Sequence, residues 1–266
     1  PCVIGNLPLI QYVFRMLEVI EKLGADITWL EERKVKIKCA NIKVDNIPFE
    51  TVARFRGSIL ILGSLLARFD RVEIPPPGGC LIGARPLDTH LDAFSQLGVD
   101  SEVKDGLFSF KKGKIPRESF ETLDFFKRKS KEKDLREVIL KEFSVTATEN
   151  ALLFSSLNRS RILMKVTDQD YQVQELIEVL REMGAEIEIK KCHTLEVQGK
   201  DKLNGFEYDI KSDPIETGTF MVAALATQGE VVIKNAALSF LDLFLKRLYD
   251  SGAKFKITKE NELKVF

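Results

Sequence analysis

Apolar residues recur at helical spacing and then switch to alternation at four places along this chain. At each place an amphipathic helix ends at a glycine and is followed by a strand in which apolar and polar residues alternate. The four segments cover residues 15–29, 91–103, 176–189 and 243–257. Their glycines, at positions where a residue without Cβ can end a helix in the left-handed conformation, are Gly24, Gly98, Gly184 and Gly252. The recurrence indicates a repeated structural unit.

A second, more apolar helix and a further strand precede three of these segments. The pattern predicts these helices over 56–69, 148–157 and 217–228, with strands at 71–74, 161–166 and 230–233. One unit therefore consists of a helix, a strand, a helix and two strands. The first unit opens at its strand, so we expect that a helix precedes Pro1 and that further chain follows Phe266.

Alternating helices and strands exclude an all-helical or all-β fold and predict an α/β protein. Three units fill residues 1–211 and a fourth begins at residue 212, which gives two predicted domains, 1–211 and 212–266. Residues 108–141 are expected to form a connection that carries the basic run 127–133. Because glutamate and serine interrupt its lysines and arginine, a solvated turn or helix face is favoured there over a phosphate-binding patch.

Composition narrows the functional classes. The 266 residues carry 40 basic and 40 acidic side chains, so no net charge attracts nucleic acid or an anionic membrane surface. The apolar stretch at 58–67 is too short to span a bilayer. Four cysteines occur without a C-x-x-C spacing. These features predict a cytoplasmic protein of a reducing environment, without nucleic-acid or membrane partners.

One loop, between the strand at 71–74 and a helix expected to start near Pro86, has the composition of a hinged flap. Three prolines stiffen its first half, and two glycines precede Cys80. Such a cysteine is either a small buried side chain or a reactive group. Its thiol could donate a proton or attack as a nucleophile, and Arg85 could favour the thiolate or bind a phosphate or carboxylate. Pro86 suits a first helical turn, where Asp88 complements the helix dipole.

At this loop the chain resembles the UDP-N-acetylglucosamine 1-carboxyvinyltransferases, which are enolpyruvyl transferases. Residues 77–90 match that family's PGGCxIGxRPxDxH motif. Three further stretches resemble family motifs in the same order: the helix at 56–68, the SVTATEN segment at 144–150 and the IETGTF segment at 215–220. The resemblance covers nearly the whole chain, and it is weakest over 104–142.

The resemblance implies an inside-out α/β barrel, with apolar helices inside and sheets outside, in each of two domains that enclose a substrate cleft. It also implies transfer of the enolpyruvyl group of phosphoenolpyruvate to the 3-hydroxyl of UDP-N-acetylglucosamine, in peptidoglycan precursor synthesis, without a metal or other cofactor. In this family Cys80 would be the general acid on a closing lid and the target of fosfomycin, and Arg85 would hold the anionic charge of phosphoenolpyruvate. The residues implied to contact the UDP-sugar are Arg56, Arg85, Pro86, Leu87, Asp88, Thr89, Ser144, Val145 and Thr146.

The chain departs from the family pattern at several positions. Glu142 stands where the motif has a lysine, Thr146 replaces a glycine and Ser64 replaces a proline. The family's lysine–asparagine segment would precede Pro1, and its catalytic aspartate would follow Phe266. These departures leave two alternatives open: a non-catalytic paralogue that binds a UDP-sugar, and a shikimate-type enolpyruvyl transferase. The cysteine flap argues against the second.

The remaining polar candidates have weaker support. Cys192 and His193 are expected on a strand, where adjacent side chains point to opposite faces and cannot share a metal. His90 is expected to form structural hydrogen bonds and not to act as a base. Helix starts are expected near Ser58, Thr148 and Thr217, where the positive end of each helix either attracts anionic ligands or is capped in the ordinary way.

Overall fold

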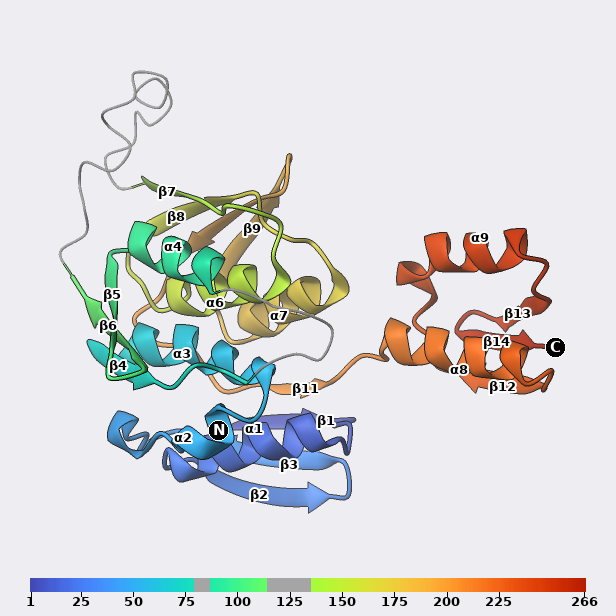
Figure 1. Ribbon diagram of the computed structural model, residues 1–266, viewed down its shortest axis with the longest axis horizontal. Coiled ribbons are helices and arrows are strands. Elements are labelled where there is room, and N and C mark those ends of the chain that lie inside the picture. Colours follow the sequence, from blue (N-terminus) through green and yellow to red (C-terminus); the bar gives the residue numbers. More distant parts are fainter. Residues whose placement is uncertain (79–86, 114–134) are drawn as a thin grey trace. The chain divides into compact units, whose positions relative to one another are not determined.

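The computed structural model describes residues 1–78, 87–113 and 135–266. Four times along the chain a strand is followed by a helix and two more strands, as the sequence pattern predicts. In each group the third strand lies between the other two and pairs antiparallel with both. The first and second strands therefore run in the same direction, which requires the helical crossover that joins them. Figure 1 shows these groups in chain order.

The first two groups are separated by short helical turns followed by an apolar helix. The first group consists of β1 (Cys2–Gly5), α1 (Gln11–Lys22), β2 (Asp26–Glu31) and β3 (Lys34–Lys38). The connection contains η1 (Val44–Asn46), α2 (Phe49–Val52), η2 (Arg56–Leu60) and α3 (Ile61–Arg68). The second group consists of β4 (Arg71–Ile74), α4 (Asp88–Gln96), β5 (Val99–Lys104) and β6 (Leu107–Lys112).

The third and fourth groups are each preceded by an apolar helix. In the third, β7 (Leu135–Ile139) and the apolar helix α6 (Val145–Ser155) come first. The group itself follows, with β8 (Arg161–Lys165), α7 (Tyr171–Glu182), β9 (Glu186–Lys190) and β10 (Thr194–Gln198). Strand β7 pairs parallel with β8, and β11 (Glu207–Asp209) lies beside β1. The fourth comprises α8 (Pro214–Ala226), β12 (Val231–Lys234), η3 (Leu238–Phe240), α9 (Asp242–Asp250), β13 (Phe255–Lys259) and β14 (Glu262–Val265).

The four glycine turns are confirmed as helix C-termini. Gly24, Gly98, Gly184 and Gly252 all have positive φ, between 85° and 106°. After α1 the Gly24 N–H donates to the Glu21 carbonyl and the Ala25 N–H donates to the Ile20 carbonyl. This pair of bonds is the Schellman arrangement, which satisfies carbonyls that the helix end would otherwise leave unpaired. A Cβ at Gly24 would lie 2.5 Å from the Asn41 carbonyl oxygen, so a side chain is excluded there.

The apolar helices α3 and α6 form the interior of the first three groups. They pack against each other, and α4 and α7 also contact α6, while the sheets lie outside them (Figure 1). Most residues of α6 are buried, and they include polar side chains such as Thr148, Glu149 and Asn150 beside the apolar ones. The two helices approach closely at Gly63, where a Cβ would lie 2.4 Å from the Asn150 carbonyl oxygen. The buried amide of Asn150 therefore faces the backbone of α3.

The chain divides into two compact units, Pro1–Tyr208 and Asp209–Phe266. The larger unit has one continuous apolar core, drawn from all three of its strand–helix–strand–strand groups. The smaller unit has its own small core around Met221, Leu263 and Val265. The sequence pattern places the boundary at residue 211, a few residues after the one that the contacts define.

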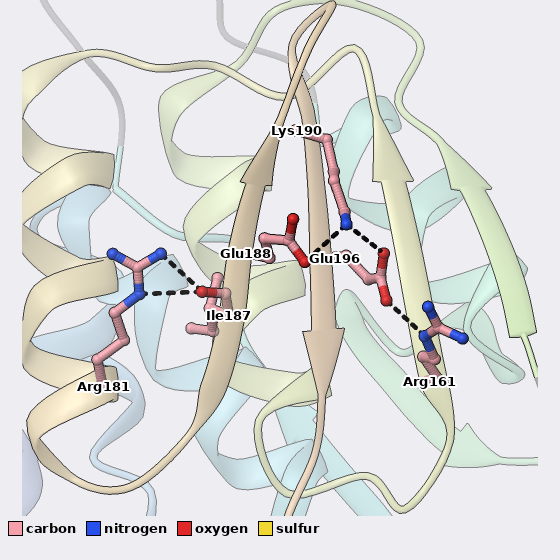
Figure 2. Close-up of polar contacts among 6 residues, drawn as sticks. All are labelled: Arg161, Arg181, Ile187, Glu188, Lys190 and Glu196. Atoms are coloured by element: carbon pink, nitrogen blue, oxygen red, sulfur yellow. Dashed lines mark hydrogen bonds and ion pairs between the residues drawn. The ribbon is translucent and has the colours of Figure 1, made fainter.

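Charged side chains cover the outer face of the sheet in the third group. Figure 2 shows Glu196 of β10 between Arg161 of β8 and Lys190 of β9. Arg161 donates to one carboxylate oxygen of Glu196, and the Lys190 ammonium lies 3.3 Å from the other. The hydrogen bond from Arg161, followed by that from Lys190, lowers the pKa of Glu196. Lys190 also lies 2.6 Å from Glu188, so its ammonium bridges the carboxylates of Glu188 and Glu196, which lie opposite each other in the pairing of β9 with β10.

The free edge of the same sheet is covered by an arginine. Strand β9 is an edge strand, and its Ile187 carbonyl accepts from Arg181 Nε at 2.9 Å and Nη2 at 2.6 Å (Figure 2). Arg181 lies in the last turn of α7, so the helix that crosses this sheet also blocks part of its edge. Such blocking disfavours pairing with a strand of another molecule.

Two apolar helices begin earlier than the sequence pattern predicts. Helix α6 starts after Ser144, whose Oγ accepts from the Ala147 N–H, and not at Thr148. Helix α8 starts after Asp213, whose carboxylate accepts from the Ile215 N–H, and not at Thr217. In both stretches several polar residues could cap the helix, and one upstream of the predicted start does so.

The other two predictions of local structure also need correction. Ser58 caps no helix: η2 begins at Arg56, and the Ser58 hydroxyl lies 2.7 Å from the carbonyl oxygens of both Val52 and Phe55. Cys192 and His193 lie in the turn between β9 and β10 and not on a strand. Both have positive φ, 57° and 50°, because the chain reverses direction there.

Across the described parts of the chain, no helix combines the length and the apolar character needed to cross a membrane.

Candidate functional site

Seven of the predicted site residues lie in the described parts of the chain. The other three, Cys80, Arg85 and Pro86, fall within 79–86, outside the described residues. The basic run 127–133 also lies outside the described residues. The seven lie at the beginnings of three helical elements, η2, α4 and α6: Arg56, Leu87, Asp88, Thr89, Ser144, Val145 and Thr146.

The start of α4 directly follows the cysteine loop in sequence. Leu87 is buried at the N-cap, and Asp88 is exposed in the first turn, where its charge complements the helix dipole as predicted. Thr89 points inward and is only 8% exposed. Its hydroxyl donates to Glu142 Oε1 at 2.8 Å. Thr89, shortly after the cysteine loop, is thus held by the segment that leads into α6.

A second contact joins α4 to α6. The imidazole of His90, 3% exposed, has Nε2 3.2 Å from Oγ1 of Thr146 in the first turn of α6. Ser144, the N-cap, uses its hydroxyl oxygen to accept from the Ala147 N–H at 3.4 Å. The structure therefore brings the predicted residues of 87–89 and 144–146 to one place, although more than fifty residues separate them.

Asn150 connects this place to α3. Its Oδ1 accepts from the Gly63 N–H at 2.8 Å, and its Nδ2 donates to the Ile59 carbonyl at 3.1 Å. The same Nδ2 lies 3.1 Å from Nδ1 of His90. Because Asn150 is 1% exposed, each of these partners would cost free energy if left unpaired. This amide therefore joins the middle of α6 to the starts of α3 and α4.

Arg56 contributes its charge to the same region. Burial, followed by the nearby positive charge of Arg56, lowers the pKa of His90 to about 4. The imidazole is therefore neutral at pH 7. This agrees with the structural, hydrogen-bonding role expected for His90.

Glu142 is an acidic side chain that is bonded to one of these predicted residues, Thr89. It is exposed and accepts from Thr89, while the neighbouring Lys141 lies 3.4 Å from Asp92 of α4. The carboxylate thus occupies the hydrogen-bonding capacity of Thr89 and adds a negative charge beside it. An anionic ligand at Thr89 would have to displace this contact and overcome the repulsion.

Glu149 is a second acidic group in this part of α6, and the sequence did not single it out. It is 9% exposed and makes no hydrogen bond with any described residue. Burial, followed by the nearby carboxylates of Asp168 and Asp170, raises its pKa to about 7. The Asp168 N–H donates to Thr148 Oγ1, which holds this loop against α6. Glu149 can therefore hold or release a proton near neutral pH.

Of the described residues that this site uses, Asn150 and Glu149 were missed as functional candidates. Both belong to the segment 144–150 that resembles a family motif, and this resemblance was the available signal. Within the described ranges, no three or more His, Cys, Asp or Glu side chains are grouped so that they could hold a metal ion.

The chain matches the family model of EPSP synthase (3-phosphoshikimate 1-carboxyvinyltransferase) over residues 1–265. It therefore belongs to this family of enolpyruvyl transferases.

Individual relatives agree with this assignment. The chain is 34% identical over 258 residues to a UDP-N-acetylglucosamine 1-carboxyvinyltransferase of Coxiella burnetii, covering 97% of this chain and 55% of the relative. It is 31% identical over 254 residues to the protein of the same name from Halorhodospira halophila, covering 96% and 56%. The crystal structure of the enolpyruvyl transferase NikO from Streptomyces tendae superposes with a TM-score of 0.76 at 17% identity, covering 99% and 59%. The α/β fold expected from the sequence is the fold of these transferases, and the chain spans about half the length of the relatives it matches.

The buried carboxyl of Glu149 should make stability depend on pH. Its pKa in the folded state, about 7, lies above the ordinary value of 4.5, so the folded protein binds more protons than the unfolded chain between these pH values. The free energy of unfolding therefore falls by about 3 kcal/mol as pH rises through this window. His90 has the opposite effect, because its lowered pKa removes stability as pH falls from 6.5 to about 4.

The comparison is therefore between Glu149→Gln and the wild type in denaturant unfolding at pH 5 and pH 8. The free energy of unfolding of the variant, relative to that of the wild type, should rise by about 3 kcal/mol from pH 5 to pH 8. The reason is that the glutamine carries no charge to desolvate. Glu102→Gln, on the exposed side of β5, controls for loss of a carboxylate. The same difference between variant and wild type at both pH values would show that Glu149 does not titrate in this way.

Proposed function

We propose that the protein transfers the enolpyruvyl group of phosphoenolpyruvate to the 3-hydroxyl of UDP-N-acetylglucosamine and releases phosphate. A proton is first added to the methylene carbon of phosphoenolpyruvate, which makes the neighbouring carbon electrophilic. The sugar hydroxyl then attacks that carbon and loses its own proton, which gives a tetrahedral ketal. Removal of a proton from the new methyl group and departure of phosphate restore the double bond. In this proposal the reaction belongs to peptidoglycan precursor synthesis in the cytoplasm and needs neither metal nor cofactor.

In this proposal Cys80 is the general acid, carried on a lid that excludes water from the reacting atoms. Arg85 binds the anionic groups of phosphoenolpyruvate, for which the guanidinium offers paired donors. Arg56 contributes a second positive charge on the UDP-sugar side.

The remaining proposed contacts to UDP-N-acetylglucosamine come from the starts of α4 and α6. Both helices direct the positive end of their dipole toward the region where these starts meet, which suits a ligand that carries two phosphates. The residues proposed to contact the UDP-sugar are Pro86, Leu87, Asp88 and Thr89 before and within α4, and Ser144, Val145 and Thr146 at α6.

The observation that carries this proposal is the junction of α4 with α6. The helix that directly follows the cysteine loop is hydrogen-bonded, through Thr89 and His90, to the segment 142–146. Both stretches resemble family motifs, and the relatives that carry the name of this activity are 31–34% identical to nearly the whole chain. We further propose that residues 1–211 belong to one inside-out barrel domain and residues 212–266 to a second. The division of contacts after Tyr208 supports this boundary.

One observation favours a second candidate, a paralogue that binds a UDP-sugar without catalysis. Glu142 places a carboxylate on Thr89, where the first candidate needs to accommodate a diphosphate. The two candidates differ in turnover and share UDP-sugar binding, so they are separated by measuring both quantities on the same protein. The shikimate-type alternative is separated by the acceptor, because it would release phosphate with 3-phosphoshikimate and not with UDP-N-acetylglucosamine.

The whole protein, incubated with phosphoenolpyruvate and UDP-N-acetylglucosamine, should release inorganic phosphate. Cys80→Ser should lower this rate at least a hundredfold, because a hydroxyl is a far weaker acid than a thiol, while UDP-sugar binding measured by calorimetry stays within about twofold. Cys39→Ser, at an exposed cysteine after β3, is the matched control and should retain the wild-type rate. Binding without phosphate release by the wild type would instead support the non-catalytic paralogue.

Glu142→Gln should strengthen UDP-N-acetylglucosamine binding about tenfold, because it removes a negative charge beside the proposed diphosphate and keeps a side chain of the same size. The gain should shrink as salt concentration rises. Glu182→Gln, exposed at the end of α7, is the control for a change in net charge. Unchanged or weaker binding by Glu142→Gln would show that the ligand's phosphates lie elsewhere.

A further inference from the structure

The orientation of the Asn150 amide follows from two backbone partners. The Gly63 N–H can only donate, so the Asn150 atom 2.8 Å away must be the oxygen. The Ile59 carbonyl can only accept, so the atom 3.1 Å from it must be the amide nitrogen. Both partners require the same placement of the amide oxygen and nitrogen, so the backbone alone determines the orientation of the amide.

This orientation determines which nitrogen of His90 carries the proton. The Asn150 amide nitrogen has two hydrogens, of which one is used by Ile59 and the other points to Nδ1 of His90 at 3.1 Å. Nδ1 must therefore accept. Burial and the charge of Arg56 lower the pKa of His90 to about 4, so the ring carries a single proton at pH 7. That proton lies on Nε2.

The proton on Nε2 in turn determines the role of the Thr146 hydroxyl. Nε2 lies 3.2 Å from Thr146 Oγ1 and donates to it, so the hydroxyl oxygen acts as an acceptor in this bond. Its own hydrogen has no acceptor among the described residues. Thr146 is half-buried in the first turn of α6, at the positive end of that helix. A hydroxyl hydrogen at such a place is available to an oxygen atom of a ligand.

We infer that His90 is a positioning residue: Asn150 holds it as the Nε2–H tautomer, and it thereby presents the Thr146 hydroxyl as a hydrogen-bond donor to a phosphate oxygen of the bound UDP-sugar. The ligand in this inference rests on the proposed function, whereas the tautomer does not. A phosphate oxygen fits because it only accepts hydrogen bonds and is negatively charged. The glycine at this position in the family motif has no side chain to accept from a histidine, so the contact distinguishes this chain from that motif.

The tautomer can be measured without any ligand. The sequence contains only two histidines, so long-range ¹H–¹⁵N spectra of the whole protein are assigned by His193→Gln, which removes the other imidazole. At pH 7 we expect His90 to show a protonated Nε2 and an unprotonated Nδ1. A protonated Nδ1, or an imidazolium ring, would overturn the inference.

The role of the hydroxyl is tested by binding of UDP-N-acetylglucosamine. Thr146→Val should weaken binding about tenfold, and Thr146→Ser, which keeps the hydroxyl, should restore it to within about twofold. His90→Phe should weaken binding in the wild type but cause little further loss in Thr146→Val, because both changes remove the same oriented donor.

The positioning role would be contradicted if His90→Phe lowered the affinity for UDP-N-acetylglucosamine equally in the wild type and in Thr146→Val. It would also be contradicted if Thr146→Val left the affinity unchanged. If the wild-type protein shows the Nε2–H tautomer but binds no UDP-N-acetylglucosamine, the proposed function fails and the assigned hydrogen-bond chain stands.

Discussion

The buried amide of Asn150 is the interaction on which the candidate site depends. It pairs with the backbone of η2 and α3 on one side and with His90 of α4 on the other, from a position in the middle of α6. Apolar packing alone would allow these helices to slide or rotate slightly, since hydrophobic contact has no preferred direction. Hydrogen bonds in a dry interior require particular distances and angles, and an unpaired partner is costly. The close approach at Gly63 allows the amide to reach the backbone of α3.

The electrostatic properties of the site follow from this packing. Burial keeps His90 neutral and raises the pKa of Glu149 to about 7, so two titratable groups near the start of α6 are uncharged over part of the physiological pH range. Glu142, which remains exposed, places a carboxylate beside Thr89. The site therefore combines two positive helix ends and Arg56 with the opposing charges of Glu142 and Asp88. Which of these dominates decides how strongly an anionic ligand is held.

The sequence predicted the repeated unit and the helix-ending glycines correctly, because both depend on local patterns. It misplaced the starts of α6 and α8. At α6, Ser144, Thr146 and Thr148 are all acceptable caps, so the pattern does not choose among them. At α8, the Asp213–Pro214 pair was a usable signal for the correct start. It identified Thr89 and Thr146 only through resemblance to a family. Their contacts with Glu142 and His90 bridge more than fifty residues, and no periodicity or spacing encodes such a pairing. Cys80 and Arg85 remain predictions from the sequence.

The central claim is that hydrogen bonding by Asn150, and not apolar packing, fixes α6 relative to the starts of α3 and α4. The most direct test is the free energy of unfolding of Asn150→Leu, measured by denaturant titration at pH 7. Leucine has a similar size and is more apolar, so it removes the Asn150 partner of the Gly63 N–H, the Ile59 carbonyl and Nδ1 of His90 while it preserves the packing. The account predicts a loss of about 2–4 kcal/mol. An unchanged or increased free energy of unfolding would contradict it.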